Sequence, residues 1–289
     1  MRALPIGVPK VMVSTMASGN VSQYVGTSDV VMFPSVVDAE GLNEISMRIF
    51  SNAVNAVAGM VENRIDIPDG GKPLLAATMF GVTTPCIKTA KEYLESQGYE
   101  VLVFHATGAG GKSMEALINA GFIKGVLDIT TTEWCDELYG GVLNAGPDRL
   151  EAAGKKGIPQ VVSVGALDMV NFGPWDTVPE QYKGRNLYPH NPTVTLMRTT
   201  VEENRGLGKV IAEKLSMAKG PTALMLPLGG VSAIDAPGQP FYGPEEDAAL
   251  FEELRRGIGP NVELVEMQNN VNDDDFALAA AKKLIELMK

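Results

Sequence analysis

The chain has 289 residues, 45% of them hydrophobic and 20% charged, which is typical of a soluble globular protein with one large or two medium domains. Its formal net charge of −11 argues against a nucleic-acid-binding surface, because phosphate binding needs clustered lysine and arginine, and no such run occurs. Two widely separated cysteines, no apolar run near the ~18 residues of a membrane span and no export signal favour a cytoplasmic protein without disulfides or membrane contact.

In chain order, residues 8–14 and 28–33 are predicted strands, separated by a loop of small residues. From Asn43 to Val61 apolar residues recur mostly at intervals of three and four, which predicts a helix. Two strands and one helix cannot bury a core of their own. We therefore expect residues 1–66 to be the C-terminal part of a first α/β domain whose start precedes this chain, or else to pack as an edge on the second domain.

The segment Ile-Pro-Asp-Gly-Gly-Lys-Pro at 67–73 concentrates turn-forming residues and is the strongest domain boundary in the sequence. Residues 67–72 are the predicted linker, and residues 73–289 the predicted second domain. Its predicted strands are continuous apolar runs, typical of strands covered on both faces: 73–80, 99–104, 125–129, 160–164, 222–226 and 262–265. Its predicted helices are 84–97, 112–119, 147–155, 200–218, 245–256 and 272–288. This alternation predicts a doubly wound, mostly parallel, Rossmann-like α/β sheet.

Small polar residues follow every predicted strand of this second domain. In an open parallel sheet, ligands lie outside the carboxyl ends of the strands, so these loops predict a shared cleft for a polar ligand. They are Gly81–Thr84, His105–Ser113, Thr130–Glu133, Gly165–Asp168, Pro227–Ser232 and Gln268–Asn270. The preference of ordinary turns and helix caps for threonine, serine and glycine accounts for any one of them alone.

The loop His-Ala-Thr-Gly-Ala-Gly-Gly-Lys-Ser at 105–113 matches a relaxed phosphate-binding loop, with Ala106 in place of the first glycine. Backbone N–H groups at the following helix would hold phosphate oxygens, and Lys112 would add a positive charge. Asp128 is the nearest candidate for the metal-binding aspartate of an ATPase, but Ile129 continues the strand beyond it. The loop is therefore predicted to bind an anion or another polar ligand, and a true ATPase loop is the alternative.

Catalysis by a histidine and a carboxylate is a second hypothesis. The only two histidines, His105 and His190, fall in predicted loops, and Glu133 and Asp168 are the candidate acidic partners. No short ligand spacing joins these four residues, so no metal site is predicted. His190 lies in a long irregular stretch at 171–199, and the proline-rich loop at 232–247 is expected to form a second wall of the cleft.

Seven long segments, among them "KPLLAATMFGVTTPC", "GYEVLVFHATGAGGKSMEALI" and "GVSAIDAPGQPFY", resemble an uncharacterised family. That family includes the ATP-binding N-terminal region of the tomato mosaic virus resistance protein, and the similarity spans nearly the whole chain. The resemblance implies two successive α/β domains, ATP binding and association as dimers. It also implies that the family's full length begins before this chain, with a glycine-rich loop just upstream, so that this chain is the C-terminal part.

These observations lead to three hypotheses. The first is a protein that binds a nucleotide, with ATP and Mg²⁺ as cofactors, or a phosphorylated small ligand. The second is a hydrolase or lyase acting on a small polar metabolite, and the third is a homodimeric interaction module without catalysis. The predicted cofactor-binding residues are Ser14, Thr15, Ser18, Gly19, Thr83, Thr84, Thr107, Gly108, Gly110, Gly111, Lys112, Ser113, Thr131 and Thr132.

Overall fold

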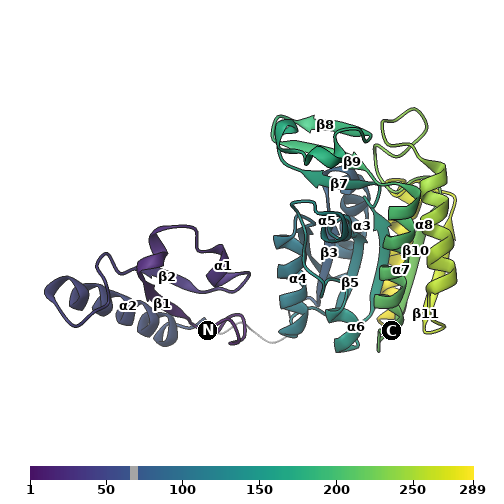
Figure 1. Ribbon diagram of the computed structural model, residues 1–289. Coiled ribbons are helices and arrows are strands. Elements are labelled where there is room, and N and C mark those ends of the chain that lie inside the picture. The colour runs from purple at the N-terminus through teal and green to yellow at the C-terminus, as the bar shows by residue number, and fades with distance from the viewer. Residues whose placement is uncertain (66–70) are drawn as a thin grey trace. The chain divides into compact units, whose positions relative to one another are not determined.

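The computed structural model of the protein describes residues 1–65 and 71–289 (Figure 1). Within it the chain divides into two compact units, residues 1–71 and residues 72–289. Residues 67–70 of the predicted linker lie outside the described residues.

The first unit is a small parallel sheet with one long helix. Strands β1 (Val11–Ser14) and β2 (Val31–Pro34) pair in parallel, and α2 (Glu44–Glu62) follows them. The described connection between the strands contains a 3-10 turn, η1 (Thr15–Ser18), and a single helical turn, α1 (Ser22–Val25). The predicted strand at 8–14 begins three residues late, because the Lys10 ammonium group donates to the carbonyls of Pro5 and Val8 and holds that segment in a turn.

The second unit is built on a six-stranded parallel sheet in the order β11-β10-β6-β5-β3-β4. Its strands are β3 (Leu74–Met79), β4 (Glu100–His105), β5 (Gly125–Thr130), β6 (Gln160–Gly165), β10 (Thr222–Pro227) and β11 (Val262–Met267). Each coincides with a predicted apolar run to within about two residues. The doubly wound fold is thereby confirmed, and β5, β6 and β10 are buried along their whole length, as a sheet covered on both faces requires.

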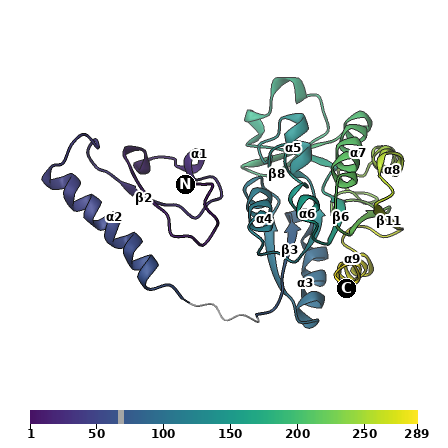
Figure 2. The same cartoon turned by 90° about the horizontal axis from the view of Figure 1, so that it is seen from below.

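Helices cover both faces of this sheet (Figure 2). One face is packed against α3 (Thr84–Ser96) and α9 (Asp274–Leu287). The opposite face is packed against α4 (Ala109–Asn119), α5 (Glu133–Tyr139), α6 (Ala152–Lys156), α7 (Val201–Ser216) and α8 (Pro244–Gly257). Successive residues of β3 point to opposite faces of the sheet. Leu75 and Ala77 pack on the face covered by α3 and α9, and Ala76 packs on the opposite face.

The stretch at 171–199 was predicted to be irregular, and this prediction is wrong. It forms most of a second, antiparallel sheet. Strands β7 (Met169–Phe172), β8 (Leu187–Asn191) and β9 (Val194–Arg198) pair in the order β7-β9-β8. Two 3-10 turns lie between β7 and β8, η3 (Trp175–Thr177) and η4 (Glu180–Tyr182). The strands are short and interrupted by Pro189, so neither alternation nor a continuous apolar run identified them.

Three helix predictions need correction. Helix α4 begins at Ala109 and not at residue 112, because Gly108 has a φ of +81° and forms its N-cap. Helix α5 was not predicted at all. The predicted helix at 147–155 is wrong in its first half: Leu150 has a φ of +71°, and its N–H and that of Ala152 donate to the Glu115 carboxylate, so α6 starts only at Ala152.

Candidate functional site

The chain leaves neighbouring strands β3 and β5 in opposite directions. After β3 it enters α3 on one face of the sheet, and after β5 it enters α5 on the other. Ligands of open α/β sheets bind at such a switch point, outside the carboxyl ends of the strands. The candidate site is therefore the set of loops that follow β3, β4, β5 and β6.

The glycine loop after β4 already holds a carboxylate of the protein itself. Glu133, at the start of α5, accepts hydrogen bonds from the backbone N–H groups of Gly108 at 2.7 Å and Gly111 at 3.1 Å. These are the groups that the phosphate-loop interpretation assigned to a ligand. A buried acid at the N-terminus of α4 is favourable because it satisfies helix N–H groups that have no partner within the helix.

The three glycines of this loop are explained by close packing. A Cβ atom at Gly108 would lie 2.5 Å from the carbonyl oxygen of Asn144, at Gly110 it would overlap the carbonyl oxygen of His105, and at Gly111 it would overlap the Glu133 carboxylate. Side chains cannot be placed at such distances without moving the backbone. The glycine pattern that resembles a nucleotide-binding motif therefore has a structural cause in this domain.

The second oxygen of Glu133 accepts a hydrogen bond from Nε of Arg149 at 2.6 Å. Arg149 is 1% exposed and also bonds both carboxylate oxygens of Asp128, at 2.5 and 2.7 Å. Burial opposes the charge, but the carboxylates of Asp128 and Glu133 outweigh it and raise the pKa of Arg149 well above its ordinary value. Asp128, a metal candidate in the sequence, is thus the ion-pair partner of a buried arginine, in the bidentate geometry that arginine favours.

Arg149 has a third acidic neighbour in Glu115, whose carboxylate lies 3.5 Å away. Burial raises the pKa of Glu115, and the charge of Arg149 acts in the opposite direction. The Arg149 cluster, which comprises Glu115, Asp128, Glu133 and Arg149, therefore carries no excess positive charge with which to attract a ligand.

The predicted threonines are also bonded within the domain. The hydroxyl of Thr83 lies 2.8 Å from that of Thr130, and Thr84 donates to the carbonyl of Phe80. Thr131 donates to the carbonyl of Ser163, and the Thr132 hydroxyl donates more weakly to the carbonyl of Met169. Thr83, Thr131 and Thr132 are fully buried, so their hydroxyl groups satisfy buried polar atoms of the fold.

The two histidines do not join the predicted carboxylates. His105 is exposed at the end of β4, and His190 is exposed in β8, 6.5 Å from the Tyr188 ring between centroids. In the described parts of the chain, neither histidine forms a hydrogen bond or ion pair with Glu133 or Asp168. The arrangement that a histidine–carboxylate catalyst needs is not assembled.

Four predicted residues belong to the first unit. Ser14 caps η1 by accepting the N–H of Met16 at 3.1 Å, and Thr15, Ser18 and Gly19 are exposed on or beside that turn. The other predicted residues of the glycine loop after β4, Thr107, Lys112 and Ser113, lie in the second unit. Lys112 is exposed in the first turn of α4, and the Ser113 hydroxyl donates to the carbonyl of Ala109.

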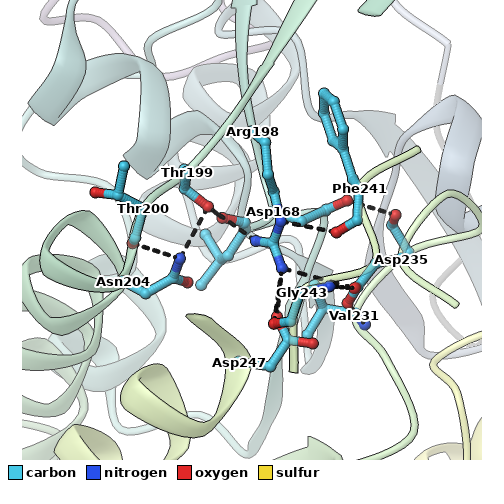
Figure 3. Close-up of polar contacts among 12 residues, drawn as sticks. Asp168, Arg198, Thr199, Thr200, Asn204, Val231, Asp235, Phe241, Gly243 and Asp247 are labelled. Carbon is cyan, nitrogen blue, oxygen red and sulfur yellow. Dashed lines mark hydrogen bonds and ion pairs between the residues drawn. The ribbon is translucent and has the colours of Figure 1, made fainter. Parts of the chain in front are cut away.

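A second buried polar group, the Arg198 cluster, comprises Asp168, Arg198, Asp235 and Asp247 (Figure 3). Arg198, at the end of β9, donates to Asp247 of α8 at 2.9 Å and lies 3.6 Å from Asp235. Asp168, after β6, accepts the hydroxyl of Ser232 at 2.7 Å, while its other oxygen is buried without a hydrogen-bond partner among the described residues.

Several carboxyl groups near the carboxyl edge of the six-stranded sheet have raised pKa values. Burial, and then the charge of Asp235, raise the pKa of Asp168 to about 7 and that of Asp247 to about 8. Burial raises the pKa of Asp136 in α5 to about 7 as well, although N–H groups of Asn171 and Leu143 donate to it. Raised pKa values of this size are common at functional sites and also in buried structural clusters.

Sequence reasoning selected Asp168 and Glu133 but missed Arg149, Asp136 and Asp247. Arg149 lies in a turn far along the chain from Asp128, and nothing in the spacing joins the two. Across residues 1–65 and 71–289 there is no group of three or more histidine, cysteine, aspartate or glutamate side chains placed to hold a metal ion. The described helices include none long and apolar enough to cross a membrane.

Comparisons with known proteins place the whole chain. Models of the uncharacterised protein family UPF0261 match residues 1–66 with its N-terminal domain and residues 72–288 with its C-terminal domain. A UPF0261 protein of Clostridium tetani is 64% identical over 290 residues, covering 100% of this chain and 72% of the relative. A UPF0261 protein of Mesorhizobium japonicum is 51% identical, covering 97% of this chain and 71% of the relative. The ToMV resistance protein Tm-1(GCR237) of Solanum lycopersicum is 49% identical, covering 99% of this chain and 39% of the relative.

Proposed function

We propose that this chain, which belongs to the uncharacterised protein family UPF0261, binds a small anionic ligand at the carboxyl edge of its parallel sheet. The observation that carries the proposal is the switch point between β3 and β5, where the helices that follow cover opposite faces of the sheet. ATP with Mg²⁺ is the specific ligand suggested by the family resemblance, and a ligand with a single phosphate or carboxylate is the more general one.

Contacts to this ligand would come from the outer side of the α4 N-terminus. Glu133 uses the N–H groups of Gly108 and Gly111, which leaves those of Ala109 and Gly110 to a ligand. Lys112, which follows Gly111, is exposed in the first turn of the helix. His105 is exposed at the mouth of the same loop. Helix N–H groups and a lysine are the usual partners of a bound phosphate.

The charge of Glu133 at the same helix end limits the affinity. One carboxylate already offsets part of the positive end of the α4 dipole, and the Arg149 cluster supplies no excess positive charge. We therefore expect weak binding, and we expect inorganic phosphate or a monophosphate to compete with ATP. The proposal includes no reaction, because no histidine–carboxylate pair supports one among the described residues.

A ligand at this site is expected to stabilise the chain against heat. At ten times its Kd, a ligand adds about 1.4 kcal/mol, which raises the melting temperature of a domain this large by about 3–6 °C. Differential scanning fluorimetry with Mg-ATP, AMP and inorganic phosphate measures this shift, and calorimetry measures the Kd. Lys112→Ala is expected to weaken binding about tenfold, and the exposed Lys124→Ala to have no effect. Absence of any shift at 10 mM of all three ligands would rule out the proposal.

We propose the cytoplasm as the location of the chain. Cys86 and Cys135 are both buried free thiols, which is the usual state of cysteines in a reducing compartment. Burial raises the pKa of Cys86 to about 12 and raises that of Cys135 well above its ordinary value, so neither is a reactive thiolate.

Self-association through α2 is a second candidate function, favoured by an observation in the first unit. Met47, Phe50, Val54, Val57 and Val61 repeat at intervals of three and four, which is the spacing of a coiled-coil seam. Met47, Val54 and Val61 are 51%, 61% and 60% exposed, although they are apolar. A second copy of the same helix would cover this seam, which gives the homodimer implied by the family resemblance.

Val54→Glu is expected to convert the dimer to a monomer, because it places a charge at the centre of the seam in each copy. Sedimentation equilibrium or light scattering on the full chain measures the mass. Asn52→Glu is the matched control, since Asn52 is exposed and lies two residues before Val54, about 160° around the helix, so that its substitution leaves the centre of the seam intact. A wild-type chain that stays monomeric at 100 μM would count against self-association.

A further inference from the structure

A long loop between β10 and α8 lies across the carboxyl edge of the sheet. We call residues 231–243 the cover loop. The N–H of Ala166, just after β6, donates to the carbonyl of Val231 at 2.9 Å, and the N–H of Ala233 donates to the carbonyl of Val82, after β3, at 2.9 Å. The cover loop therefore contacts the ends of two strands that are not neighbours in the sheet.

Members of the Arg198 cluster hold both ends of the cover loop. The Asp235 carboxylate accepts the N–H groups of Val231 at 2.8 Å and Gly243 at 3.3 Å, which closes the loop on itself. Arg198 donates to the carbonyl oxygens of Phe241 at 2.8 Å and Gly243 at 3.1 Å (Figure 3). The same side chains that carry charge in the cluster therefore hold the loop in place.

The cluster has more acidic than basic groups. One guanidinium group, 6% exposed, faces Asp168 and Asp235, both 0% exposed, and Asp247, 7% exposed. If all three carboxyl groups were ionised, the buried cluster would have a net charge of −2, which costs much free energy away from water. If two of them keep a proton, the remaining carboxylate balances Arg198. Charge balance in the closed arrangement thus requires bound protons.

We propose that the cover loop is a pH-sensitive cover of the carboxyl edge, closed while the Arg198 cluster keeps its protons and released when they are lost. Asp168 belongs to the turn after β6 and Asp247 to α8, both of which are packed into the core. Asp235 belongs to the cover loop, most of whose residues from 236 to 242 are exposed. Movement of the loop is therefore the way in which the cluster separates its charges and admits water.

The direction of the pKa shifts agrees with this proposal. Burial raises the pKa of Asp168 to about 7 and that of Asp247 to about 8, above the ordinary aspartate value of 3.8. A raised pKa means that the closed form binds more protons than an open, hydrated form. Closure is then most favourable below pH 4 and is progressively lost as the pH rises to about 8. Each proton released on opening increases the opening equilibrium tenfold per pH unit.

Asp136 of α5 is a further buried carboxyl group with a pKa raised to about 7, but it accepts the N–H groups of Asn171 and Leu143 and does not bond the cover loop. Cys135 of α5 donates its thiol hydrogen to the carbonyl of Leu167, and burial keeps its pKa well above the ordinary value. Glu203 of α7 pairs with Arg185, which together with its hydrogen bond from Thr200 holds the pKa of Glu203 low despite burial. Glu246 of α8 is partly exposed, beside Gly243.

Hydrogen exchange of the full chain, read by NMR or by mass spectrometry of peptides, tests the proposal. The reporters are the N–H groups of Val231, Ala233, Phe241 and Gly243, all hydrogen-bonded in the closed loop. After correction for the intrinsic exchange rate, their opening equilibrium is expected to rise about 10- to 100-fold per pH unit between pH 5 and 7. The amides of β3 and β5 are expected to stay protected over the same range.

Asp247→Asn removes one titrating group while keeping an oxygen for Arg198, so it is expected to reduce the pH dependence to about tenfold per unit or less. Asp275→Asn, at an exposed position in α9, is the matched control and is expected to behave as the wild type. Loop protection that does not change with pH would overturn the proposal. So would loss of protection that occurs together with β3 and β5, because that result means global unfolding, or an Asp247→Asn profile identical to the wild type.

Discussion

Replacing Arg149 by methionine is expected to lower the free energy of unfolding by about 3–5 kcal/mol. The substitution leaves the carboxylates of Asp128 and Glu133 buried at 2% and 1% exposure without their cation. Methionine fills a similar volume, so the loss reports the uncompensated charge and not an empty cavity. Urea denaturation at pH 7 measures the change.

A triple variant isolates the cause of this loss. Arg149→Met combined with Asp128→Asn and Glu133→Gln removes all three charges and is expected to recover part of the stability. Arg205→Met is the matched control, since Arg205 forms an exposed ion pair with Glu202 one turn away in α7. Its effect is expected to stay below about 0.5 kcal/mol. A loss below 1 kcal/mol for Arg149→Met would show that the cluster contributes little.

Gly110→Ala is expected to destabilise the domain by about 2–3 kcal/mol, although alanine favours helices by about 1 kcal/mol over glycine. The added Cβ would overlap the carbonyl oxygen of His105. This oxygen is a backbone atom, so it cannot rotate aside as the end of a flexible side chain could. The start of α4 must therefore shift, and the hydrogen bonds from Gly108 and Gly111 to Glu133 are strained with it.

The control for this substitution is Gly81→Ala, at the end of β3. No atom lies within 4 Å of a Cβ built there, and the residue does not need a positive φ. Its effect on the free energy of unfolding, measured by urea denaturation, is expected to be within about 0.5 kcal/mol. Equal effects of the two substitutions would mean that α4 adjusts easily and that the close packing of Gly110 is not a constraint.

The sheet could be predicted from the sequence because buried parallel strands leave a local signal. The apolar run from Gln160 to Val164 needs no knowledge of its neighbours to be identified as β6, and the capping box at Thr200 marks the start of α7 in the same way. Strand β8, with Pro189 in its middle, and the short helix α5 have no comparable local signal.

The candidate site could be predicted only in outline, because its chemistry depends on contacts between distant residues. Glu133 was selected as an acid after a strand, but its roles at Gly111 and Arg149 follow from how α4, α5 and the turn before α6 meet. The prediction grouped His105 with Asp168 because both were expected to follow strands, yet His105 is the exposed last residue of the edge strand β4, whereas Asp168 is buried after β6. The position of a residue just after a strand predicts that it lies at the carboxyl edge of the sheet, but it does not predict whether the side chain is exposed or which residues it contacts.

The carboxylate of Glu133 acts as a tethered competitor for the α4 N-terminus. A group held in place by its own chain has an effective concentration of at least the millimolar range, and geometry as favourable as 2.7 and 3.1 Å raises it further. A free phosphate reaches the amides of Gly108 and Gly111 only by exceeding that concentration and separating Glu133 from Arg149. A sequence motif that resembles a nucleotide loop can thus be partly occupied from within, so that an outside anion meets the amides of Ala109 and Gly110 first and gains the other two only when the protein's own acid leaves.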